Sequence, residues 1–211
     1  MIRAPSGAEA GRCVTSRREF LKVGLVASTL PVAAVADLAV ADDAPPPAVP
    51  LYKVLYDTRF AASVAFARRA SARGLAVQAM GGDMTEFWYE DLYHRWQKGP
   101  AAIAGLTAHG ALFCLERLAW EQRMRVVFRG EHALAAEDRV AHRFEGAATF
   151  LPAAVRAMSD PAWAGALADV VASCPVGRQT RQAATALTAS ARTLPASEAL
   201  FSWVIAPWTR T

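Results

Sequence analysis

From residue 51 onward, short apolar runs alternate along the chain with longer stretches whose apolar residues recur at helical spacing. The short runs cover residues 51–56, 75–80, 101–106 and 124–128, and their length and composition predict four β-strands. A helix is expected in each interval between them, because strands that alternate with helices are typical of an α/β domain. The pattern therefore predicts a parallel sheet connected by right-handed crossovers.

Glycine, proline and capping residues mark the ends of these predicted helices. Gly74 follows the first helix, and Gly99 with Pro100 follows the second. The second helix begins at Asp83, a good N-cap residue, and Glu86 stands three residues later, as in a capping box. These signals mark both ends of the second helix.

The second half of the chain has a less regular pattern. Residues 133–149 are compatible with a helix followed by a loop, or with a strand around residues 140–144. Asp160 followed by Pro161 is typical of a helix start, and that helix is expected to reach about residue 173.

Two further elements complete the predicted domain. A helix is expected over residues 179–191, and the apolar run 200–205 predicts a final strand at the edge of the sheet. The whole pattern predicts a single three-layer α/β domain over residues 51–211, with a mostly parallel sheet and a helical C-terminal half. Its alternation of elements is similar to that of flavodoxin-like and Rossmann-like sheets.

A short basic segment and an apolar run precede this domain. Residues 16–22 read Ser-Arg-Arg-Glu-Phe-Leu-Lys, and the positions that resemble the twin-arginine export motif are Arg17, Arg18, Phe20 and Leu21. The apolar run over residues 23–36 has 14 residues. A helix that spans a bilayer needs roughly 20 residues, so no permanent membrane anchor is expected.

Small residues suited to signal-peptide cleavage follow at Ala36 and at Ala41, and the second site is preferred. The resemblance implies a signal peptide over residues 1–41, the twin-arginine translocase as a partner, and a mature protein in the periplasm. Residues 42–50 are rich in proline and predict a stiff, extended spacer before the domain.

The net charge of the whole chain is +4. Removing residues 1–41, which carry five basic and three acidic groups, leaves +2. A field this weak argues against nucleic acid or an anionic membrane as a partner.

The cysteines limit which cofactors and cross-links the domain can contain. Cys114 and Cys174 are the cysteines of the predicted domain, and without a Cys-x-x-Cys pair they exclude an iron–sulfur cluster. Proteins exported by the twin-arginine route fold in the reducing cytoplasm, so two free thiols are expected rather than a disulfide. Cys114 lies in an apolar pattern, which predicts that it is buried.

Polar groups follow each of the four predicted strands. In open α/β sheets, ligands bind beyond the carboxyl ends of the strands, so these groups form the candidate site. The candidate catalytic residues are Asp57, Asp83, His109, Glu131 and His132. The candidate ligand-binding residues are Thr58, Arg59, Gly81, Gly82 and Thr107.

Each candidate also has a structural interpretation. Asp57, Asp83 and Thr107 can cap helices, and Arg59 can form an exposed salt bridge with either aspartate. His109 stands near a predicted helix N-terminus, where the dipole favours a neutral imidazole. His109 and His132 are conceivable metal ligands, but no His-x-x-x-His or His-x-His spacing supports them, and no resident metal is predicted.

Cofactor and nucleophile motifs are missing from the chain. It contains no P-loop, no dinucleotide-binding fingerprint and no Gly-x-Ser-x-Gly turn. A faint likeness of residues 57–63 to the phosphate loop of flavodoxins leaves a flavin or nucleotide carrier as a minor hypothesis.

Two main hypotheses about function follow. In the first, the protein is an exported accessory or binding component that acts beside a cofactor-containing redox enzyme, because this route exports folded proteins and the chain has no cofactor motif of its own. In the second, it is a periplasmic enzyme that uses the Asp/His/Glu candidates for acid–base or metal-assisted chemistry. The enzyme hypothesis requires Asp57, Asp83, His109 and His132 to converge in one pocket.

Overall fold

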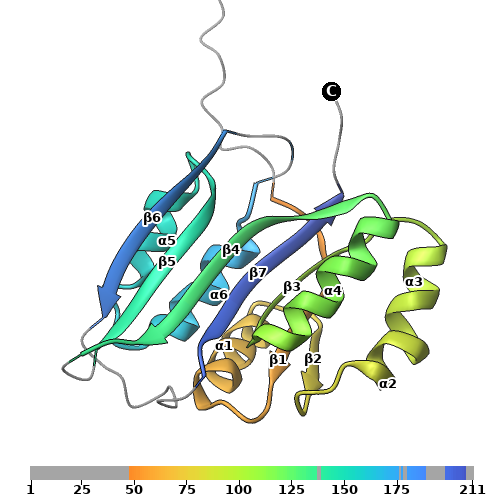
Figure 1. Cartoon of the computed structure of the whole chain (residues 1–211), viewed down its shortest axis with the longest axis horizontal. Helices are drawn as coiled ribbons and strands as arrows, with labels where there is room; N and C mark the ends of the chain where they lie inside the picture. Colours follow the sequence, from red (N-terminus) through yellow and green to blue (C-terminus); the bar gives the residue numbers. More distant parts are fainter. Residues whose placement is uncertain (1–47, 137–138, 176, 178–179, 189–197, 208–211) are drawn as a thin grey trace, which may run out of the picture. The chain divides into compact units, whose positions relative to one another are not determined.

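The computed structural model describes residues 48–136, 139–175, 177, 180–188 and 198–207. The export segment 1–41 and most of the spacer lie outside the described residues, so the predictions made for them stay predictions. Within the described residues, seven strands form one mixed sheet in the order β2-β1-β3-β7-β4-β5-β6 (Figure 1). The strands are β1 (Leu51–Asp57), β2 (Val77–Met80), β3 (Ala102–Ala108), β4 (Met124–Leu134), β5 (Val140–Ala147), β6 (Arg181–Thr188) and β7 (Leu200–Pro207).

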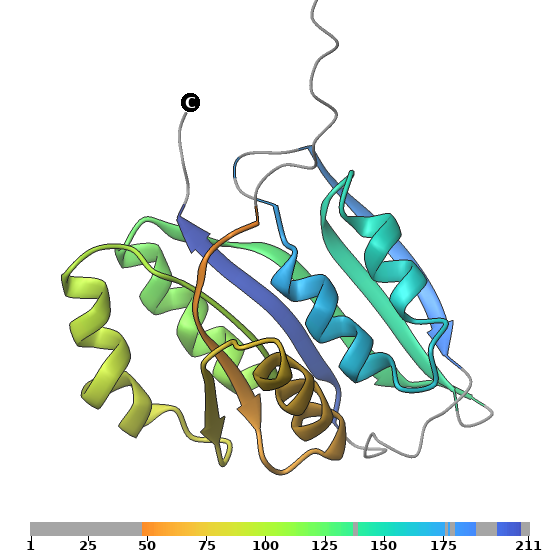
Figure 2. The same cartoon turned by 180° about the vertical axis from the view of Figure 1, so that it is seen from behind.

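Helices pack on both faces of this sheet, which confirms the predicted α/β class (Figures 1 and 2). One face carries α1 (Ala61–Ala72), α5 (Leu151–Ala157) and α6 (Trp163–Ala172). The other carries α2 (Thr85–Phe87), the π-helical turn η1 (Trp88–Leu92), α3 (Tyr93–Gln97) and α4 (His109–Glu121). No helix among the described residues is long and apolar enough to cross a membrane.

The prediction of a mostly parallel sheet is wrong. β1 pairs in parallel with β2 and β3, whereas the described pairs that involve β4, β5, β6 or β7 are antiparallel. β7 is a central strand between β3 and β4, not the predicted edge strand. Trp203 of β7 faces Gly105 of β3, where an added Cβ would lie 2.6 Å from the indole ring. The missing side chain at Gly105 thus makes room for the indole at the centre of the sheet.

The predicted helical C-terminal half is also wrong. The strand alternative around residues 140–144 is confirmed as β5, and β6 replaces the helix expected over residues 179–191. β6 reads Arg-Gln-Ala-Ala-Thr-Ala-Leu-Thr, and its alanines fit a helix or a strand equally well. Pairing along the whole of β5 decides in favour of the strand. The expected helix after Pro161 is confirmed as α6, although it begins at Trp163.

Several element ends differ from the predicted ones. β3 continues through Thr107, so this residue does not cap α4. β4 continues to Leu134, which places Glu131 and His132 inside a strand rather than in a loop. The N-cap of α2 is Met84 rather than the predicted Asp83, although the Asp83 carboxylate accepts the backbone N–H and the hydroxyl of Thr85 at 2.8 and 2.7 Å.

Two apolar clusters, one on each face, hold the layers together. The cluster between the sheet and α1, α5 and α6 includes the buried residues Phe66, Phe128, Phe144 and Trp163. The cluster beneath α2, η1, α3 and α4 includes Leu55, Leu92, Trp96, Leu112 and Trp203. Burial of this apolar surface is the main stabilising contribution to the fold.

Candidate functional site

Asp57, at the end of β1, is fully buried and paired with Arg59. Arg59 donates its Nε and Nη2 protons to the two carboxylate oxygens at 2.9 and 2.7 Å, and its backbone N–H to one of them at 3.1 Å. The guanidinium lies against Gly82, where an added Cβ would be 2.8 Å from Cζ. The structure therefore brings together Asp57, Arg59 and Gly82, and the arginine occupies the carboxylate that was expected to act on a ligand.

The neighbouring candidates also have local partners or face solvent. Thr58 donates its backbone N–H and its hydroxyl to the carbonyl of Met80 at 2.8 and 3.1 Å, which joins the loops after β1 and β2. Gly81 and Asp83 are exposed in the second of these loops. Thr107 is buried, and its hydroxyl accepts the indole N–H of Trp203 at 3.1 Å.

The remaining ionisable candidates lie in three different environments. His109 is exposed at the start of α4, as predicted, and its ring packs against Phe113 and Phe201. Glu131 is exposed on one face of β4, whereas His132 points to the opposite face and is fully buried. Among the described residues, no group of three or more His, Cys, Asp or Glu side chains is arranged to hold a metal ion.

His132 belongs to a buried chain of hydrogen bonds whose direction can be deduced. The Thr188 hydroxyl donates to the carbonyl of Met158 at 2.5 Å, so it can only accept from Nε2 of His142, 3.0 Å away. Nδ1 of His142 must then accept the Nδ1 proton of His132 at 2.7 Å. Nε2 of His132 in turn accepts the Ser202 hydroxyl proton at 2.9 Å. Each side chain in this series of hydrogen bonds has its partners when both imidazoles are neutral.

Burial keeps this pair of histidines neutral. It lowers the pKa of His142 to about 4, and burial together with the nearby His142 lowers the pKa of His132 well below its ordinary value. The indole of Trp163 packs on both rings, with centroids 4.8 and 4.9 Å away. Ser202 and His132 have the spacing of a nucleophile and its base, but Ser202 is fully buried and cannot meet a substrate. The arrangement specifies how β4, β5, β6 and β7 pack.

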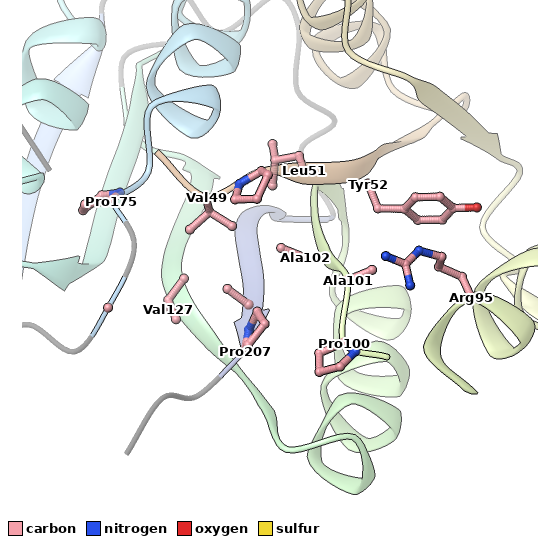
Figure 3. Close-up of a pocket in the computed structure, with 13 residues that line it drawn as sticks. Val49, Leu51, Tyr52, Arg95, Pro100, Ala101, Ala102, Val127, Pro175 and Pro207 are labelled. Carbon is pink, nitrogen blue, oxygen red and sulfur yellow. The ribbon is translucent and has the colours of Figure 1, made fainter. Parts of the chain in front are cut away.

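A hollow suited to a small ligand lies at the opposite end of β1 and β3 from the predicted site, where these two strands begin (Figure 3). We call it the proline-lined pocket, and its volume is about 470 Å³, within the usual range for ligand sites. It is formed where β1 and β3 begin and β7 ends. Its walls are Val49, Pro50, Leu51, Tyr52, Arg95, Pro100, Ala101, Ala102, Val127, Pro175, Gly177, Ala206 and Pro207.

Arg95 of α3 is the only charged residue in the described lining of this pocket. Figure 3 shows its guanidinium beside the ring of Tyr52 at one end of the hollow, with Val49, Val127 and Pro207 toward the other end. Its Cζ lies 5.4 Å from the centroid of the Tyr52 ring, and Nη1 donates to the carbonyl of Gly99 at 3.1 Å. No carboxylate among the described residues forms an ion pair with Arg95, so the guanidinium keeps donors for a ligand.

A second network fixes the position of the Tyr52 ring. The Tyr52 hydroxyl donates to Asp91, and the ammonium group of Lys53 pairs with the same carboxylate. Burial opposes ionisation of Asp91, but the hydrogen bonds from Lys53 and Tyr52 outweigh it and lower the pKa of the carboxyl. The hydrogen bond to Asp91, helped by burial, raises the pKa of Tyr52. The ring under Arg95 therefore stays neutral and in place.

Sequence reasoning missed the proline-lined pocket because its residues form no motif. They come from six separate segments, and most are proline, alanine or valine, which a pattern assigns to turns and core. The sequence features that could have indicated this pocket are Tyr52 beside Lys53 at the start of β1 and the prolines at several element ends. No protein-family model, curated protein or solved structure matches this chain.

Proposed function

We propose that this protein is an exported periplasmic binding component that holds a small, largely apolar carboxylate in the proline-lined pocket. The observation that carries the proposal is Arg95, a cation without a described ion-pair partner at one end of an otherwise apolar hollow. Apolar walls favour the body of such a ligand, and a guanidinium is suited to bind a carboxylate through two parallel hydrogen bonds.

The twin-arginine-like segment supports the periplasm as the place of action and the translocase as a partner. A role beside an exported redox enzyme fits a folded cargo without a cofactor motif, and the bound carboxylate would then be delivered to or protected for that enzyme. The enzyme hypothesis gains no support, because the four residues that it requires in one pocket lie apart. Its candidates Asp57, Asp83, His109 and His132 have separate partners in the structure.

Calorimetry with octanoate and its uncharged analogue octanol tests the proposed binding. Octanoate should bind more tightly than octanol, and Arg95→Gln should weaken octanoate binding by about ten- to a hundredfold, because a charge-assisted hydrogen bond contributes roughly 1.5–3 kcal/mol. Arg68→Gln, on the exposed side of α1, is the matched control. Equal affinity of the wild type for both probes, or of Arg95→Gln and wild type for octanoate, would refute the proposal.

A further inference from the structure

One face of the antiparallel half of the sheet is not covered by any helix of the described residues. α5 and α6 cover the other face of β5 and β6, whereas Figure 1 shows this face open beside α4. It contains a hollow of about 550 Å³. We call this surface the β5–β6 floor, and its side chains are Glu131, Ala133, Ala141, Arg143, Glu145, Ala183, Thr185 and Leu187.

The floor is built in rows across the strands. Ala133, Ala141 and Leu187 lie opposite one another, and Leu187 is 58% exposed. The register also places Arg129, Glu145 and Ala183 in one row. The floor is two to three strands wide, about 10–14 Å, which matches the diameter of one α-helix with its side chains. An apolar row of this exposure is typical of a surface that another element covers.

The outer side of α4 is the complementary feature. Phe113 and Trp120 are 48% and 42% exposed, and the guanidinium of Arg117 lies between them. Its Cζ is 5.2 Å from the Phe113 ring and 4.4 Å from the Trp120 ring. We call these three residues the α4 ridge. Aromatic and arginine side chains of this kind are enriched in protein interfaces.

We propose that the β5–β6 floor of one copy of this chain receives the α4 ridge of a second copy, in a dimer with a two-fold axis parallel to the strands. α4 stands directly beside the floor of its own chain, so this axis places each α4 over the floor of the other copy. An in-plane axis perpendicular to the strands would instead superimpose the two α4 helices, which is sterically impossible. A specific interface needs about 1,000 Å² of buried surface, and the two-fold axis doubles the area that a single ridge-to-floor contact buries.

The axis also predicts which residues meet, because rotation about it leaves each residue at its own level along the strands. The level of α4 is set by the ion pair of Glu116 with Arg129, at 2.6 Å. Arg117, the next residue, therefore lies at the level of the row that contains Glu145. Glu145 accepts from Arg143 of its own chain through one carboxylate oxygen, at 3.2 Å, and this exposed pair leaves the second oxygen for a partner. Arg117 of each copy should pair with Glu145 of the partner copy, while Phe113 packs toward the apolar row that ends at Leu187.

Sedimentation equilibrium of the exported protein over a range of concentrations tests this dimer. Arg117→Glu and Glu145→Arg should each weaken self-association by at least about tenfold, because each places like charges opposite one another. The double variant restores opposite charges and should recover most of the wild-type dimerisation. Arg68→Glu, on α1 at the other face of the sheet, is the control and should dimerise as the wild type does.

Circular dichroism of each variant confirms that it is folded, which is expected because both substituted side chains are exposed or half-buried. A wild type that is monomeric at every concentration overturns the proposal. A dimer that survives both single reversals, or that the double variant fails to restore, overturns it as well. Binding of the floor to another protein without self-association would likewise contradict the second copy as its occupant.

Discussion

The Nδ1 atoms of His132 and His142 lie 2.7 Å apart in the buried core, with one proton between them. The hydroxyl groups of Ser202 and Thr188 occupy the outer nitrogens of the pair. A second proton on His142 would make its Nδ1 a donor that faces the Nδ1–H of His132, and a second proton on His132 would bury a charge in the core. No acidic side chain is among the described hydrogen-bond or ring partners of the two histidines, so this core is sensitive to acid.

The free energy of unfolding should therefore fall as the pH drops from 6.5 toward 4. In this window the unfolded chain binds protons on both histidines and the folded chain does not, because their folded pKa values are lowered, that of His142 to about 4. Stability rises with pH wherever the unfolded state binds more protons, so two histidines give a slope of up to about 2.7 kcal/mol per pH unit.

Urea unfolding at several pH values measures this slope. His142→Gln, which removes one titrating group, should reduce it to about half. His94→Gln, an exposed histidine on α3, should leave it unchanged. A slope in His142→Gln equal to that of the wild type would contradict the buried-pair account. The lowered pKa values of Asp83, Asp91 and Asp169 add to this slope only at the acid end of the window, because carboxyls with an ordinary pKa of 3.8 begin to bind protons in the unfolded chain below about pH 5.

Arg59 should stabilise the domain through the buried carboxylate of Asp57. Arg59→Ala leaves that carboxylate fully buried without its bidentate partner. Because 46% of the Arg59 side chain is exposed and water can partly replace it, a loss of about 2 kcal/mol in unfolding free energy is expected. Arg68→Ala on α1 should change little. An equally small effect of Arg59→Ala in denaturant titrations would show that the pair contributes nothing to stability.

The two cysteines of the domain should differ strongly in reactivity. Both are free; Cys114 is exposed on α4, contrary to its predicted burial, and Cys174 is buried. Burial raises the pKa of the Cys174 thiol to about 12, so almost no thiolate forms at neutral pH. Iodoacetamide labelling followed by mass spectrometry should modify Cys114 in the native protein and both thiols in denaturant. Equal native labelling rates would show that Cys174 is accessible.

Export should depend on the two arginines of the leader. Replacing Arg17 and Arg18 by lysine keeps the charge but removes the pattern that resembles the twin-arginine motif. Cell fractionation should then find the precursor in the cytoplasm, whereas Arg3→Lys should be exported normally. Periplasmic accumulation of the double variant would remove the basis for the proposed location.

Local patterns predicted the parallel half of the fold well. β1, β3 and α1 follow from apolar runs and helical spacing, and Gly74 ends α1 with a φ of +78°, as a helix C-terminus favours. The position of β7 could not be predicted, since strand order depends on contacts far apart in the sequence, such as Trp203 on Gly105. The buried histidine pair was hidden for the same reason, because its members come from different strands.

The candidate site was predicted only in part. The rule that ligands bind at the carboxyl ends of strands correctly gathered Asp57, Arg59 and Gly82, but they form an internal pair. That rule assumes a parallel sheet, and here the antiparallel β7 enters at the centre. The proline-lined pocket lies at the other end of the strands, and its cation, Arg95, follows His94 on a short helix with no distinguishing spacing.

Native mass spectrometry of the protein purified from the periplasm tests the binding proposal most directly. The wild type and the Arg68→Gln control should carry a small organic acid as added mass, and Arg95→Gln should have lost it. A ligand-free wild type, or an Arg95→Gln variant that carries the same added mass, would contradict the assignment of the proline-lined pocket as a carboxylate-binding site.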